Sequence, residues 1–184
     1  MDTPTNENPL RLYEAQGSLV DTALDFYRPV LAQGGTALAV ARRSNREALD
    51  GHFQHTTRVP AVRYRSFDAD ETIDRFLADG RPDPARFDEV VGGLVRDAIR
   101  EGPPVAVFSE MVAILWERGE PDAAVHLEQL WNRLARENRF ELMCAYSTRG
   151  LLDPTIRAKL IAVRGEHTEA IAPDAFGKLV AKVG

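Results

Sequence analysis

Short apolar runs alternate along the chain with longer segments whose apolar residues recur at helical spacing. The runs at 36–41 and 103–109 are apolar almost throughout, which is typical of parallel strands buried on both faces. Segments of similar length at 10–14, 61–67 and 140–147 predict three more strands. The intervening segments predict helices over 18–35, 44–53, 68–80, 83–102, 111–119 and 121–138, and after 150 we expect helix, a strand-like stretch and a last helix.

Residues that can cap a first helical turn precede several of these helices. We expect caps at Ser18, at Ser44 together with Glu47, at Asp68 or Asp70, and at Asp83 before Pro84. Strands that alternate with helices predict an α/β fold, in which a mostly parallel sheet lies between two layers of helices. The expected architecture is therefore a three-layer α/β/α sandwich.

The length and charge of the chain narrow its class. At 184 residues it is long enough for one domain with a substantial core. Its net charge of -5 and the lack of a Lys/Arg block disfavour direct binding to nucleic acid or to an anionic membrane. Residues 1–9 are polar, do not resemble a signal peptide and predict a disordered tail. No apolar run approaches the ~20 residues that span a bilayer, so we expect a cytoplasmic protein.

Cysteine and histidine give no metal signature. Cys144 is the one cysteine, and no Cys/His cluster has zinc spacing. His52 and His55 lie on one predicted helix without a third ligand, so we interpret them as a solvated helix end. Cys144 lies within a strand and is expected to be a small buried apolar residue, since no adjacent Lys or His favours a reactive thiolate. We therefore expect no metal and no cofactor.

The common catalytic and phosphate-binding motifs are missing. The chain has no GxxxxGK[ST] loop, no GxGxxG after a strand, no GxSxG and no HExxH. This disfavours nucleotide hydrolases, serine hydrolases and zinc hydrolases. We expect a protein that is not an enzyme.

Polar residues gather where the predicted strands end. Because ligands of open parallel sheets bind beyond the carboxyl ends of the strands, these residues are candidates for a ligand site. They are Tyr13, Glu14, Arg42, Asp68, Glu110 and Tyr146. Glu110 has several possible roles. It could bind a ligand, hold a metal-bound water or act as a general base. Alternatively it accepts hydrogen bonds from the backbone of a neighbouring loop or pairs with an arginine such as Arg42.

A second carboxylate, Glu128, shares a helical face with Ala124, Leu127, Trp131 and Leu134. A carboxylate among apolar side chains needs a partner. We expect it to accept from a tryptophan indole or a loop N–H, with a ligand-facing role as the alternative. Trp116, Trp131, Glu128 and Cys144 are thus assigned structural roles in the core.

Several motifs in order resemble one known family. They are "LYE" at 12–14, "DADETIDRF" at 68–76, "GRPDPARFDEVVG" at 80–92, "VFSEMVAILWERG" at 107–119, "LEQLWNRLAR" at 127–136 and "FELMCAYS" at 140–147. Together they resemble the MEDS domain, a sensory domain named for methanogens, methylotrophs and the dichloromethane-responsive regulator. The resemblance covers residues 10–172 and leaves a C-terminal helix at 173–184. Ser109 stands where the family pattern has glycine.

The resemblance implies a fold similar to that of the RecA and KaiC ATPases without the phosphate-binding loop. It also implies a bacterial or archaeal signalling module that works with histidine kinases, transcription regulators or anti-sigma-type switch proteins. The leading hypothesis is a sensor that binds a small ligand or a partner protein at the carboxyl ends of the strands. The second is a ligand-free interaction module that docks or homodimerises through Phe176, Leu179 and Val180. The third is a degenerate nucleotide hydrolase with Glu110 as base.

Overall fold

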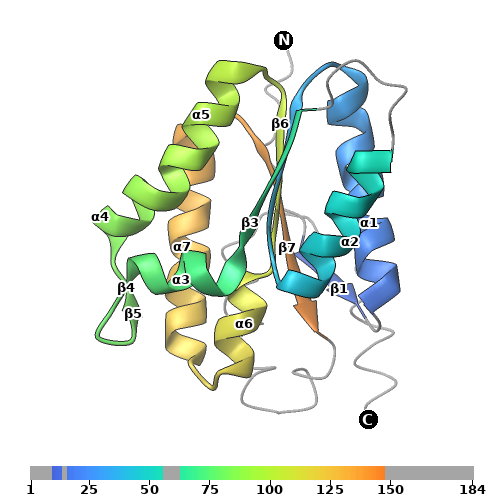
Figure 1. Ribbon diagram of the computed structural model, residues 1–184. Coiled ribbons are helices and arrows are strands. Elements are labelled where there is room, and N and C mark those ends of the chain that lie inside the picture. Colours follow the sequence, from blue (N-terminus) through green and yellow to red (C-terminus); the bar gives the residue numbers. More distant parts are fainter. Residues whose placement is uncertain (1–9, 14–15, 56–62, 148–184) are drawn as a thin grey trace.

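The computed structural model describes residues 10–13, 16–55 and 63–147 (Figure 1). Five strands form one sheet in the order β1-β7-β6-β2-β3, and every neighbouring pair is parallel. They are β1 (Leu10–Tyr13), β2 (Thr36–Ala41), β3 (Arg63–Asp68), β6 (Val105–Ser109) and β7 (Glu141–Ser147). All five were predicted, β2 and β6 as apolar runs and the other three as segments of strand length. The predicted tail at 1–9, Glu14, the terminal helix at 173–184 and its three apolar residues lie outside the described residues.

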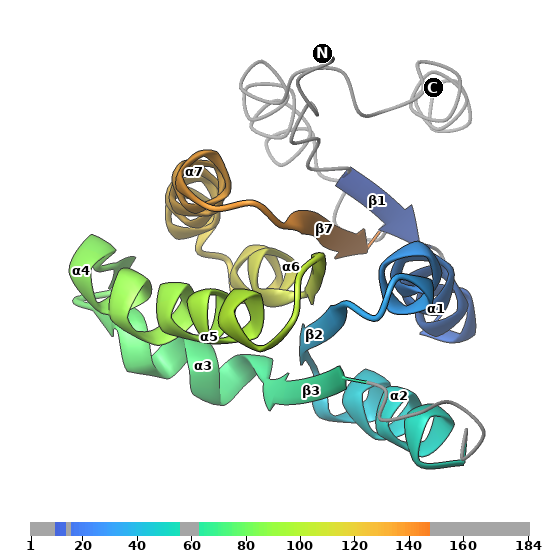
Figure 2. The ribbon, with the colours of Figure 1, turned by 90° about the horizontal axis from the view of Figure 1, so that it is seen from above.

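Helices cover both faces of the sheet, so the predicted α/β sandwich with its parallel sheet is confirmed (Figure 2). One face carries α1 (Gln16–Ala32) and α2 (Arg43–His55). The other carries α3 (Ala69–Phe76), α4 (Pro84–Phe87), the π-helical turn η1 (Asp88–Gly92), α5 (Gly93–Glu101), α6 (Met111–Glu117) and α7 (Pro121–Glu137). None of the helices in the described ranges is long and apolar enough to cross a bilayer.

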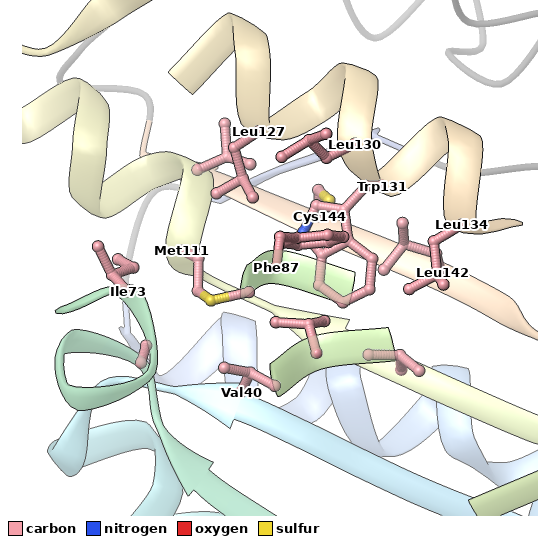
Figure 3. Packing of buried hydrophobic residues seen from close by; sticks show 14 of the residues in the cluster. Val40, Ile73, Phe87, Met111, Leu127, Leu130, Trp131, Leu134, Leu142 and Cys144 are labelled. Carbon is pink, nitrogen blue, oxygen red and sulfur yellow. The ribbon is translucent and has the colours of Figure 1, made fainter. Parts of the chain in front are cut away.

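Alternation along the buried strands divides the core into two clusters. In β2, Ala37, Ala39 and Ala41 face α1 and α2, whereas Leu38 and Val40 face the other layer. The small alanines let α1 approach closely, and the buried Tyr27 of α1 donates its hydroxyl to the carbonyl of Leu38 at 2.7 Å. The larger cluster lies under α7, where Trp131 packs among Phe87, Leu142 and Cys144 (Figure 3).

Two predicted caps are correct and two are wrong. Asp68 accepts from the N–H groups of Asp70 and Glu71 at the start of α3, and Asp83 accepts from Arg86 N–H at 2.8 Å. The structure begins α1 at Gln16 and α2 at Arg43, so Ser18 and Ser44 lie inside their helices.

The helix predicted over 68–80 is shorter than expected. It ends at Phe76, and a hairpin of β4 (Leu77–Ala78) and β5 (Arg81–Pro82) follows. Asp79 and Gly80 form its turn with φ of 50° and 73°, the left-handed conformation that an Asp-Gly pair favours in two-residue hairpins. The strands are too short to leave a period-two pattern, so the sequence analysis missed the hairpin.

Gly92 leaves room for the side chain of Arg96. Arg96 of α5 donates from Nη1 to Oδ1 of Asp88, the first residue of η1, and from Nη2 to the Asp88 carbonyl, both at 2.9 Å. A Cβ on Gly92 would lie 2.7 Å from Asp88 Oδ1 and 2.8 Å from Arg96 Nη1. Glycine therefore leaves room for this ion pair, which bridges the widened turn.

Gly35, between α1 and β2, is expected to tolerate no side chain. An added Cβ would lie 2.2 Å from the backbone oxygen of Pro104, which already accepts from Thr36 N–H. Gly35→Ala should lower the free energy of unfolding by about 2 kcal/mol because backbone must move. Gly51→Ala is the matched control: Gly51 lies inside α2, and beyond the backbone of its own helix no atom of the described residues lies within 4 Å of a Cβ added there. It should raise stability by roughly 0.5 kcal/mol.

Urea denaturation of both glycine variants would check this pair of effects. Equal effects at the two positions would contradict the packing seen at Gly35.

Candidate functional site: the junction of β2 and β6

The strands β2 and β6 are neighbours in the sheet, but the chain continues from them toward opposite sides of the sheet. From β2 the chain passes through α2 to β3 on one side, and from β6 it passes through α6 and α7 to β7 on the other. The helix that follows β2 (α2) and the helix that follows β6 (α6) lie on opposite faces of the sheet (Figure 2). Such a topological switch point is where open α/β sheets form a ligand crevice at the carboxyl ends of their strands. Arg42 follows β2 and Glu110 follows β6 at this point.

Glu110 fills the junction. Its side chain is 0% exposed. Oε2 accepts from the backbone N–H of Arg42 at 2.9 Å, and Oε1 accepts from the side-chain amide of the buried Asn45 at 3.0 Å. Its own N–H donates to the carbonyl of Val40 at 3.0 Å. Glu110 thus joins the end of β6 to the end of β2 and to the first turn of α2.

Arg42 links the buried Glu110 to the protein surface. Its Nε lies 3.6 Å from Glu110 Oε1, and its Nη1 lies 2.8 Å from Glu117 Oε2 at the end of α6. The side chains of Arg42 and Glu117 are 30% and 43% exposed. We call Arg42, Asn45, Glu110 and Glu117 the switch-point network. It connects a buried carboxylate to a solvated one through a single arginine.

The carboxylate of Glu110 also takes the place of an anion at a helix N-terminus. The first turn of a helix attracts negative charge through its unpaired N–H groups and its dipole. Here an internal carboxylate binds the N–H that precedes α2. An anionic ligand that approached the crevice would therefore find this position occupied by the protein itself.

Burial raises the pKa of Glu110, and three contacts oppose this rise: the Asn45 amide, the Arg42 N–H and the Arg42 guanidinium. Desolvation disfavours the charged form, while hydrogen bonds and a nearby positive charge favour it. Since the net direction is upward, the folded protein binds a proton at Glu110 more tightly than the unfolded chain does.

This pKa shift predicts a pH dependence of stability. A carboxyl whose pKa is raised on folding contributes stability that is fully present below its ordinary value of 4.5 and is lost as pH rises through the folded-state value. The free energy of unfolding of the wild type relative to Glu110→Gln, which cannot titrate here, should therefore fall as pH rises above 4.5. Urea denaturation of both proteins from below pH 4.5 to neutrality measures the difference. A difference that grew with pH would show that the pKa is lowered instead.

Further ion pairs lie at the carboxyl-terminal ends of the strands. Asp68 ends β3, caps α3 through Oδ1, and has Oδ2 3.5 Å from Arg46 Nη2 on α2. Beside it, Arg118 donates to Asp70 at 2.8 Å. The carboxyl ends of β3, β2 and β6 thus carry a continuous row of paired charges. Among the described residues, no group of three His, Cys, Asp or Glu side chains is placed to hold a metal ion.

The structure brings together three of the six predicted ligand-site residues: Arg42, Asp68 and Glu110. Tyr13 and Tyr146 belong to the neighbouring strands β1 and β7, where Leu12 pairs with Tyr146. Both therefore lie at the carboxyl-terminal end of the sheet. Their side chains and Glu14 fall outside the description. Sequence reasoning missed Asn45, Arg46 and Glu117. Asn45 left a signal, because it is a polar residue four positions before the buried Leu49 on the inner face of α2.

The residues assigned to the core lie as follows. Trp116, Trp131 and Cys144 belong to the cluster on the α3–α7 face, and Glu128 on α7 is 1% exposed. The indole Nε1 of Trp131 is buried and has no hydrogen-bond partner in the described part of the chain. Trp131 is therefore not the donor to Glu128 that the sequence suggested. Its ring packs edge-on against Phe87, with centroids 5.4 Å apart.

Ser109 has a local role at the start of α6. It is fully buried, and its Oγ accepts from the N–H of Met111 at 3.3 Å. This hydrogen bond satisfies one of the first N–H groups of the helix, which a glycine could not do. It also stabilises the turn from β6 into α6, and Glu110 lies in that turn.

Comparison with protein families gives one result for the chain. The family model described as "MEDS: MEthanogen/methylotroph, DcmR Sensory domain" matches residues 10–162. The match spans all of the described sheet and its helices. No curated protein and no solved structure gives a significant match.

Proposed function

Because this chain belongs to the MEDS family of sensory domains, we propose that it is a sensory and signalling module without enzymatic activity. In this proposal it responds to a small ligand or a partner protein and regulates transcription or a kinase or sigma-factor pathway in the bacterial cytoplasm. A relation to the RecA and KaiC fold is part of the proposal. The parallel sheet with helices on both faces supports it.

The buried, hydrogen-bonded state of Glu110 is the observation that supports the proposed lack of enzymatic activity. A general base must come within hydrogen-bond reach of the proton that it removes from a substrate. Both oxygens of Glu110 already accept hydrogen bonds from Arg42 and Asn45, and its side chain has no exposed surface. The sequence also has no phosphate-binding loop. The geometry therefore favours a structural carboxylate over a catalytic one.

In this proposal the signal acts on the exposed end of the switch-point network. Arg42 is shared between a buried and a solvated glutamate, so a group that competes for Glu117 or for the guanidinium would change how Arg42 pairs with Glu110. That change would reach the starts of both α2 and α6. A signal can shift such a network only if it binds one arrangement more tightly than the other.

Isothermal titration against a panel of cytosolic metabolites tests the ligand form of the proposal. A metabolite that binds the wild type should bind Glu117→Gln about tenfold more weakly, a loss of about 1.4 kcal/mol. Glu101→Gln is the matched control, because Glu101 forms a comparable exposed pair with Arg65. Unchanged affinity in Glu117→Gln would show that the switch-point network is not part of the ligand site. ATP hydrolysis that disappeared in Glu110→Gln would contradict the non-enzymatic assignment.

The same observation favours an alternative without any small ligand. If Glu110 permanently occupies the crevice, the charged row at the sheet edge is left as a surface for a protein, such as a histidine kinase, a regulator or an anti-sigma-type switch. A photo-crosslinking amino acid at Glu117 should then capture such a partner in the native cell. The same amino acid at Gln129, exposed on α7, serves as control. Crosslinking of one defined partner from Glu117 alone, together with no metabolite binding, would favour this alternative.

A further inference from the structure

Glu110 is a buried carboxylate whose two hydrogen-bond donors are both neutral. Oε2 accepts from the backbone N–H of Arg42 at 2.9 Å, and Oε1 accepts from the side-chain amide of Asn45 at 3.0 Å. The side chain of Glu110 is 0% exposed, so solvent does not stabilise its charge. A carboxylate away from water is costly to keep charged unless a cation pairs with it closely. The position of the nearest cation therefore decides how readily Glu110 keeps its charge.

That cation, the guanidinium of Arg42, is divided between two carboxylates. Its Nε lies 3.6 Å from Glu110 Oε1, which is beyond hydrogen-bond distance, whereas its Nη1 lies 2.8 Å from Glu117 Oε2. The side chain of Glu117 is 43% exposed, so water also stabilises its charge. Arg42 is thus placed closer to the carboxylate that needs it less, and Glu110 receives only part of its attraction.

The other charges around the junction are paired with one another. Arg46 on α2 has Nη2 3.5 Å from Oδ2 of Asp68 at the end of β3, and Arg118 after α6 donates to Asp70 at 2.8 Å. The strands β2 and β6 contain no charged residue. Within the described ranges, the charged groups that act on Glu110 are therefore those of the switch-point network itself.

Opposing contributions act on the protonation of Glu110. Burial favours the neutral form and raises the pKa of Glu110, and the negative charge of Glu117 adds to this rise. The Asn45 amide, the Arg42 N–H and the Arg42 guanidinium favour the charged form. Because the net direction is upward, Glu110 binds its proton at higher pH in the folded protein than in the unfolded chain.

Binding of this proton would change the contacts on both sides of the carboxyl group. A neutral carboxyl no longer attracts the guanidinium, so Arg42 shifts toward Glu117. The hydrogen bond from Arg42 N–H loses its charge assistance, and charge-assisted bonds are roughly twice as strong as neutral ones. The first turn of α2 also loses the negative charge that complements its dipole. The protonation of one side chain thus affects α2 and α6, which lie on opposite faces of the sheet (Figure 2).

We infer that Glu110 is a proton switch at the junction of β2 and β6. While Glu110 is charged, Arg42 is shared between Glu110 and Glu117. When Glu110 binds a proton, Arg42 shifts to Glu117 and the first turn of α2 loses its internal anion. This inference deepens the proposed function and rests on it for its biological role, because it names the proton as a signal to which the switch-point network responds.

Nuclear magnetic resonance of the full-length chain, from below pH 4.5 to neutrality, tests the switch. The carboxyl carbons of labelled glutamate report the protonation of Glu110, and the side-chain Nε signal of Arg42 reports how this arginine is paired. The Glu110 step should lie above pH 4.5, and the Arg42 signal should move with the same midpoint. In Glu110→Gln, which cannot titrate at this position, both steps should disappear.

Glu117→Gln distinguishes a switch from an isolated buried carboxylate. It removes the negative charge that raises the pKa of Glu110 and leaves more of the Arg42 charge for Glu110, so the Glu110 midpoint should move to lower pH. Glu101→Gln is the matched control: it removes a comparable exposed partner from Arg65 and should leave the midpoint unchanged. Circular dichroism checks that each variant is folded, and Glu117→Gln keeps the test decisive if Glu110→Gln is not.

Three results would each overturn the switch. They are a Glu110 midpoint at or below pH 4.5, an Arg42 signal that does not follow this midpoint, and a midpoint that Glu117→Gln moves no more than Glu101→Gln does. Such a failure is distinct from failure of the proposed function, because the metabolite titration and the crosslinking at Glu117 do not depend on the protonation of Glu110.

Discussion

Trp131→Ala is expected to lower the free energy of unfolding by about 4 kcal/mol, within the range for removing a large aromatic side chain from a core. Trp131 is 0% exposed and lies at the centre of the cluster between α7 and the sheet (Figure 3). Its ring contacts Phe87 edge-on and lies 6.3 Å, centroid to centroid, from Phe140. Alanine would leave a cavity between elements from three parts of the chain, and rigid neighbours cannot close it fully.

Trp131→Phe is the matched control. A buried indole N–H normally needs an acceptor, but the Nε1 of Trp131 has none among the described residues. Phenylalanine therefore removes no hydrogen bond and relieves an unpaired donor, so the loss should be only about 1 kcal/mol. Urea denaturation followed by circular dichroism measures both variants. A Phe variant as unstable as the Ala variant would show that the indole N–H has a partner.

Glu110→Ala is expected to cost about 3 kcal/mol of stability because it leaves buried donors without acceptors. The Asn45 amide and the Arg42 N–H would both lose the carboxylate that binds them. The Arg42 guanidinium is partly exposed and can turn to Glu117 and water, so it adds little to the loss. The variant should also loosen the junction between β2 and β6, which hydrogen exchange of the first turns of α2 and α6 would detect.

Glu117→Gln provides the comparison for Glu110. It removes the exposed partner of the same arginine, and exposed ion pairs contribute about 0.5 kcal/mol or less. Near-equal losses in the two variants would mean that Glu110 acts as an ordinary surface charge. A large loss in Glu110→Ala alone would identify the buried carboxylate as the residue that holds the junction together.

The two predictions concern different parts of one architecture. Trp131 fills the layer between the sheet and α7, and Glu110 joins β6 to β2 at the topological switch point. A sensory domain has to transmit a local change, and rigid elements with shared hydrogen bonds can do so. In the function proposed here, the core keeps the elements rigid and the switch-point network is the part that a signal can alter.

The sequence by itself determined the parallel α/β architecture. Apolar runs such as 36–41 and 105–109 have the length and composition of doubly buried strands, and the periodic segments between them form helices. Asp68 and Asp83 marked helix starts correctly because a cap acts on N–H groups two or three residues away. The motif series also indicated the family that the comparison then found. All of these signals are local in sequence.

Only the tertiary structure decided what Glu110 binds. Its partners Arg42 and Asn45 lie 68 and 65 residues away in sequence, and they meet it because β6 and β2 are neighbours in the sheet. The sequence left several roles open for Glu110, which were a ligand contact, a metal-bound water, a general base or an internal partner, and strand order supplied the internal partner. Hydrophobic periodicity reports which face of an element is buried, but a hydrogen bond between distant residues depends on which elements pack together.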